Sequence, residues 1–110
     1  MPADPSQLIV VLCTVPDEET GGRLARLLVE RRLAACVNRL PAVTSTYWWE
    51  GEVQSDTEAL LVVKTRHELF ERLERELSEA HPYEVPEIVA LPMTACSGPY
   101  ATWLVESTGG

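Results

Sequence analysis

The sequence is poor in cysteine, in basic residues and in long apolar runs. Its three cysteines are an odd number without paired spacing, which argues against a disulfide framework. Nine basic residues against 17 acidic ones give a net charge of −8, which argues against nucleic acid or an anionic membrane as a partner. No apolar run is long enough to span a bilayer, and the first residues lack the basic and apolar regions of a signal peptide. We therefore predict a cytoplasmic location.

The length of 110 residues predicts one domain over residues 1–110, with a frayed N-terminus at residues 1–7.

The stretch Thr44–Thr65 predicts a long β-hairpin. Glu50-Gly51 is a tight-turn signal, and the Tyr, Trp, Thr and Val residues on both sides favour strands. The two arms run from about residue 35 to residue 65, with a bulge expected at Pro41. Arms of about 15 residues would be roughly 50 Å long, whereas a domain of this length has a radius of gyration of about 13 Å. We therefore predict that the tip, with Tyr47–Trp49, is buried against other copies of the chain.

The other predicted elements surround this hairpin. They are a strand at 8–15, a helix capped by Asp17 and ending near Arg32, a helix with a capping box at Thr65–Glu68 that stops before Pro82, an edge strand at 88–91, and a last helix that starts at Ser97 and packs through Tyr100, Trp103 and Leu104. This order is typical of the α+β class, as a ferredoxin-like βαββαβ sandwich with a short C-terminal helix.

The direction of each predicted element brings candidate residues to one end of the domain. The first strand carries Cys13 to the end where the hairpin tip lies. The second helix returns to the same end and brings His81, Tyr83 and Glu87 there. We predict that these residues and the aromatic tip lie close together, where they could line a cleft between subunits.

Several stretches together resemble the CutA divalent-cation tolerance family. They are Val10–Asp17, Leu33–Asn38, Thr44-Ser45, Tyr47–Gly51, Lys64-Thr65 and His81–Glu87. The resemblance covers nearly all of residues 8–106. It implies ferredoxin-like domains that assemble as trimers through their long hairpins, similar in fold and assembly to the PII signalling proteins.

The resemblance also implies a role in tolerance of copper and other divalent metals, with no established catalytic reaction. In the family's copper-binding pattern the first-strand cysteine is one proposed ligand, which here is Cys13. Two adjacent histidines before Pro-Tyr complete the pattern, and here His81 is present while Ala80 occupies the other position. Thiolate and imidazole suit copper, particularly Cu(I). The alternatives remain a buried core thiol for Cys13 and a helix-end histidine for His81.

Two functions follow from these observations. The first is a divalent metal ion tolerance protein, a homotrimer formed through the Thr44–Thr65 hairpin that binds copper ion and is not an enzyme. The alternative is a PII-like small-molecule sensor that uses the intersubunit cleft and signals to a protein partner. An acylphosphatase-like hydrolase would need an arginine-bearing loop after the first strand, and Cys13–Asp17 has no arginine.

Overall fold

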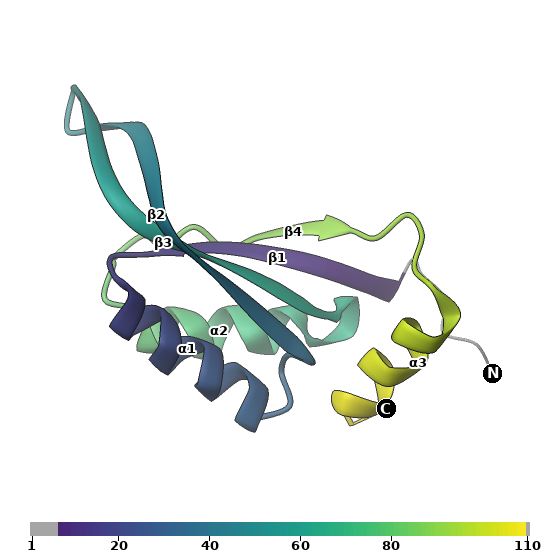
Figure 1. Cartoon of the computed structure of the whole chain (residues 1–110). Coiled ribbons are helices and arrows are strands. Elements are labelled where there is room, and N and C mark those ends of the chain that lie inside the picture. The colour runs from purple at the N-terminus through teal and green to yellow at the C-terminus, as the bar shows by residue number, and fades with distance from the viewer. Residues whose placement is uncertain (1–6, 110) are drawn as a thin grey trace.

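The computed structural model describes residues 7–109, so the predicted frayed N-terminus lies outside the described residues except for Gln7. The elements are β1 (Leu8–Val15), α1 (Glu18–Glu30), β2 (Cys36–Trp49), β3 (Glu52–Arg66), the 3-10 turn η2 (His67–Leu69), α2 (Phe70–Ala80), β4 (Val89–Pro92) and α3 (Gly98–Ser107). The strands form one antiparallel sheet in the order β2-β3-β1-β4, and α1 and α2 cover one of its faces (Figure 1). This confirms the predicted ferredoxin-like α+β sandwich, with β4 at an edge.

The core lies between the sheet and the two long helices. Successive side chains of a strand point to opposite faces, so alternate residues of β1 and β3 face the helices. The helices contribute a leucine stripe at helical spacing. The main core residues are Val11, Cys13, Val15, Ala59, Leu61, Val63, Leu24, Leu28, Leu73 and Leu77.

The opposite face of the sheet is largely apolar as well. Strand register aligns Leu12 with Val62 of β3 and with Val89 of β4, and these residues lie on the face away from α1 and α2. The helix α3 covers only one end of the sheet, where Leu8 packs with Leu104. We call the remainder the open sheet face.

The hairpin of β2 and β3 has the predicted turn and bulge. Trp49 pairs with Glu52, and the two loop residues Glu50 and Gly51 have φ angles of 51° and 79°, as a type I′ turn requires. The strand register shifts between Leu40 and Val43, at the predicted position of Pro41. Figure 1 shows the hairpin projecting beyond the helices, and the molecule is 50 Å long in that dimension.

Two local predictions were wrong. The Thr65 hydroxyl does not cap a helix, because it is buried and donates to the Leu33 carbonyl at 2.6 Å, while β3 continues through Arg66. The second helix therefore starts through η2. In α3 the buried residues are Ala101 and Leu104, whereas the rings of Tyr100 and Trp103 are exposed in the single chain.

Two adjacent glycines in α1 differ in their surroundings. A Cβ on Gly21 would lie 3.2 Å from Val15 Cγ2 and 3.5 Å from Leu61 Cδ2, both in the core. A Cβ on Gly22 would meet the tip of the Arg39 side chain, which is exposed and can move. We predict that Gly22→Ala raises the free energy of unfolding by about 0.5–1 kcal/mol, because alanine loses less backbone entropy in a helix.

Gly21→Ala is the matched control, and it should gain less or destabilise because Val15 must shift. Urea denaturation of both variants measures the difference. A larger stability for Gly21→Ala than for Gly22→Ala would show that Arg39 is held rigidly against α1.

Candidate functional site

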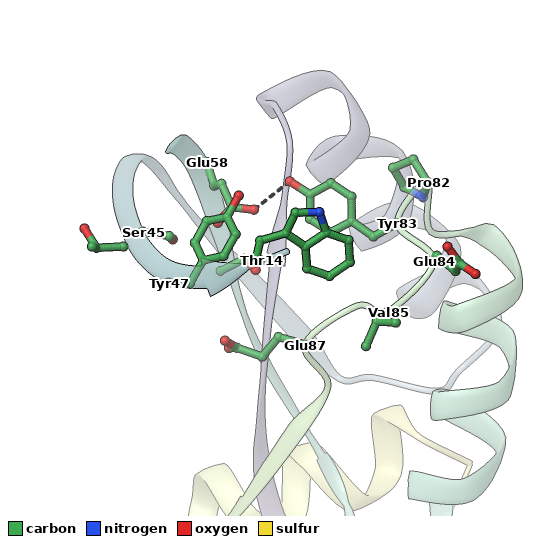
Figure 2. Close-up of a pocket in the computed structure, with 11 residues that line it drawn as sticks. Thr14, Ser45, Tyr47, Glu58, Pro82, Tyr83, Glu84, Val85 and Glu87 are labelled. Carbon is green, nitrogen blue, oxygen red and sulfur yellow. Dashed lines mark hydrogen bonds between the residues drawn. The ribbon is translucent and has the colours of Figure 1, made fainter. Parts of the chain in front are cut away.

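A pocket of about 700 Å³ lies where the end of β1, the base of the hairpin tip and the loop after α2 meet. Figure 2 shows the side chains of this pocket. Its lining residues are Thr14, Ser45, Thr46, Tyr47, Trp49, Glu58, Pro82, Tyr83, Glu84, Val85 and Glu87. The local fold explains this set: Thr14 points away from the core because its neighbours Cys13 and Val15 point into it. The hairpin and the loop then supply two walls.

The most buried charged group of the pocket is Glu58 of β3, which is 9% exposed. Its Oε2 accepts a hydrogen bond of 2.6 Å from the Tyr83 hydroxyl, as Figure 2 shows. Burial, and then this bond to a carboxylate, raise the pKa of Tyr83 well above its ordinary value. Tyr83 therefore stays a neutral hydrogen-bond donor. Nearby, the hydroxyl of Tyr47 donates to Asp56, and this bond raises the pKa of Tyr47.

His81 fixes the loop that carries Tyr83. Its Nδ1 accepts the Tyr83 backbone N–H at 3.0 Å, and its Nε2 lies 2.9 Å from the Thr14 carbonyl oxygen. Because a backbone N–H only donates and a carbonyl only accepts, Nε2 carries the proton and donates to Thr14. The two rings of His81 and Tyr83 also pack with their centroids 4.8 Å apart. The imidazole thus ties the loop to β1 and positions Tyr83 toward Glu58.

Cys13 points into the core and not into the pocket. Its side chain is fully buried among the residues between sheet and helices. Burial, and then the nearby carboxylates of Glu87 and Glu58, raise the pKa of the thiol to about 12. At neutral pH Cys13 is therefore a protonated core thiol.

The contacts of Cys13 and His81 determine whether these two residues could bind copper. The chemistry of thiolate and imidazole suits copper, but Cys13 is protonated and both nitrogens of His81 already have partners. Within residues 7–109, no group of three or more His, Cys, Asp or Glu side chains is placed to hold a metal ion. One chain therefore offers a thiol and an imidazole but no complete set of ligands.

The predicted gathering of residues at one end is confirmed in part. Tyr83, Glu87, Tyr47 and Trp49 line one pocket, and His81 lies directly behind it. Trp48 is not among the lining residues. The sequence reading also missed Thr14, Ser45 and Glu58. The only signal for Glu58 is a carboxylate placed directly before the apolar run of β3.

The chain is an antiparallel ferredoxin-like sandwich with a projecting hairpin and a pocket at the base of the hairpin tip. These features place it in a class of small α+β domains. Within that class, the chain belongs to the CutA1 divalent ion tolerance family, whose model, described as CutA1 divalent ion tolerance protein, matches residues 9–107.

Individual relatives agree with this assignment. The divalent-cation tolerance protein CutA of Thermus thermophilus is 53% identical over 100 residues, which are 91% of this chain and 97% of the relative. A solved structure of the Thermus thermophilus protein has a TM-score of 0.90 at 52% identity, covering 93% of this chain and 99% of the other.

Plant relatives are longer. The protein CutA, chloroplastic, of Arabidopsis thaliana is 51% identical over 100 residues, which are 91% of this chain but 55% of the relative. The chain thus spans little more than half of the length of that protein.

The names of the relatives place them in different compartments. The Arabidopsis protein is named chloroplastic, and a solved CutA of Archaeoglobus fulgidus, 36% identical with a TM-score of 0.90 over 92% of this chain and 98% of the other, is named periplasmic. In residues 7–109, no helix has both the length and the apolar character needed to cross a membrane. The cytoplasmic location stays a prediction.

Proposed function

We propose that this chain acts in divalent ion tolerance as a homotrimer that binds ligands and catalyses no reaction. The observation that carries the proposal is the hairpin tip, where Trp48 is 73% exposed in the single chain and Val53 beside it is exposed as well. The open sheet face adds Val89 and Leu91, each nearly half exposed. Exposed apolar surface of this extent is typical of an interface. Membership of the CutA1 family supports the tolerance role.

In the proposed homotrimer, three-fold symmetry relates the contacts between copies. A homotrimer uses the same contact three times around one axis, so every tip and every open sheet face is covered in the same way. In such an assembly the pocket at the base of the tip lies next to a neighbouring copy.

Within this role, we propose copper as an ion that the chain binds, through Cys13 and His81. Copper(I) would displace the thiol proton of Cys13 to solvent, because ligating cysteine is a thiolate. Ligation through Nε2 of His81 would replace its hydrogen bond to Thr14 and move the imidazole proton to Nδ1, so the hydrogen bond from the Tyr83 N–H would be lost as well. Water or a neighbouring copy would have to supply the remaining ligands.

A copper(I) titration with a competing chromogenic chelator tests this part. We expect the affinity to rise about tenfold per pH unit near neutral pH, because one thiol proton is released for each ion bound. Cys13→Ser and His81→Gln should each abolish competitive binding. Cys36→Ser is the matched control, since Cys36 is a free thiol outside the pocket. Binding that survives Cys13→Ser would overturn the assignment of these ligands.

The pocket favours a second candidate function, a small-molecule sensor that signals to a protein partner. Its volume of about 700 Å³ is within the range of ligand-binding pockets. Binding of a small molecule in this pocket, together with absence of copper affinity, would support the sensor over the copper-binding protein.

A further inference from the structure

The charge of the pocket restricts the ligands that it can take. Three of its eleven lining residues are the carboxylates Glu58, Glu84 and Glu87, and none is lysine or arginine. Asp56 adds a fourth carboxylate next to Tyr47. The whole chain carries a net charge of −8, which strengthens the negative potential. A phosphate or carboxylate ligand would meet like charges here and no cationic side chain among the lining residues of the chain.

Glu58 is the buried carboxylate of this pocket, and none of the salt bridges among residues 7–109 involves it. It is more than nine-tenths buried, and the hydrogen bond that it accepts comes from a neutral hydroxyl, that of Tyr83. The ion pairs found among residues 7–109 involve Glu30, Glu68 and Glu76, not Glu58. Removing a carboxylate from water without a cationic partner is unfavourable. A cation bound in the pocket would supply the missing partner.

The remaining walls identify the kind of cation. Tyr47, Trp49 and Tyr83 bring three aromatic rings to the pocket, and Pro82 and Val85 add apolar surface. In Figure 2, the Tyr83 hydroxyl is directed at the carboxylate of Glu58. Aromatic faces attract ammonium and guanidinium groups, and apolar walls suit an alkyl stem. A metal ion would need a cluster of ligating side chains, and residues 7–109 contain no such cluster.

We propose that this pocket binds a small organic cation, of the alkylammonium or polyamine class, with its charged nitrogen at Glu58. The inference names the ligand class for the sensor function proposed above and does not depend on copper binding. It excludes an anionic metabolite such as a nucleotide as the ligand of this pocket.

Calorimetric titration of the full chain with spermidine, and separately with ATP, tests the proposal. We expect spermidine to bind once per chain and ATP not to bind. Glu58→Gln should weaken spermidine binding about tenfold or more, because it removes a charged and largely desolvated partner. Glu87→Gln should weaken it by a smaller factor, since this side chain is exposed and screened by salt.

A matched control distinguishes binding in the pocket from unspecific attraction to an acidic protein. Glu74→Gln removes the same charge from an exposed position of α2 that is outside the pocket, and should leave the spermidine affinity unchanged. An equal loss in Glu74→Gln would show unspecific attraction to an acidic protein and overturn the proposal. Binding of ATP without spermidine, or of neither, would overturn it as well. Glu87→Gln keeps the test valid if Glu58→Gln does not fold.

The copper titration separates this inference from the copper proposal. Glu58→Gln should retain whatever copper affinity the unmodified chain has, while Cys13→Ser should retain spermidine binding. The two proposals can therefore fail independently, because each has a variant that should affect only its own ligand.

Discussion

Replacing both Trp48 and Trp49 with alanine is expected to turn the proposed homotrimer into monomers at micromolar concentration. The two rings are largely exposed in the single chain, and they lie at the end of a hairpin that extends beyond the helices (Figure 1). Burying each ring against a neighbour contributes about 2 kcal/mol, and two rings from each of three chains contribute about 12 kcal/mol to the assembly. Tryptophan is also among the residues enriched at the energetic hot spots of interfaces.

Analytical ultracentrifugation measures this outcome directly. Val29→Ala is the matched control, because Val29 is exposed and apolar but lies on α1, away from the hairpin. The control should sediment like the unmodified chain. A double variant that remains trimeric with unchanged melting would show that the tip is not the contact between copies. A folded monomer of the unmodified chain at micromolar concentration would contradict the homotrimer itself.

The features that the sequence predicted correctly depend on local backbone chemistry. Gly51 specified the turn because glycine takes a positive φ without a steric cost, and Pro41 specified the bulge because proline cannot donate a ladder hydrogen bond. The order of elements then fixed the direction of each strand. That direction alone was enough to bring Tyr83 and Glu87 to the end of the domain that carries the tip.

The features that the sequence did not predict depend on partners far along the chain. Thr65 fits a capping box locally, but the carbonyl of Leu33 takes its hydroxyl once the sheet has formed. As a charged residue, Glu58 would be expected to face solvent. The hydrogen bond from Tyr83, 25 residues later in the chain, holds it in the pocket wall instead. For Cys13 the run of apolar residues on both sides left the face of the strand undecided, and the structure turns the thiol into the core. Tertiary contacts decide each of these cases.

The burial of Cys13 leads to the second large effect, on the reactivity of its thiol. Its pKa is raised from 9.0 to about 12, so the fraction of thiolate at neutral pH should be about a thousandfold lower in the folded chain than in the unfolded chain. We expect iodoacetamide to label Cys13 at least a thousandfold more slowly in the native protein than in urea. Because the thiolate is the reactive form, its native labelling rate should rise about tenfold per pH unit toward pH 12.

Mass spectrometry of the same molecule provides the reference, because Cys36 and Cys96 are both free and only partly buried. These two thiols should be labelled before Cys13. If Cys13 instead reacts as fast as Cys36 at pH 8, its thiol is open to solvent and ionised in solution. That outcome would contradict the core role of Cys13 and would favour its use as a ready metal ligand. Slow labelling would mean that any copper bound there must first displace a proton from the interior of the fold.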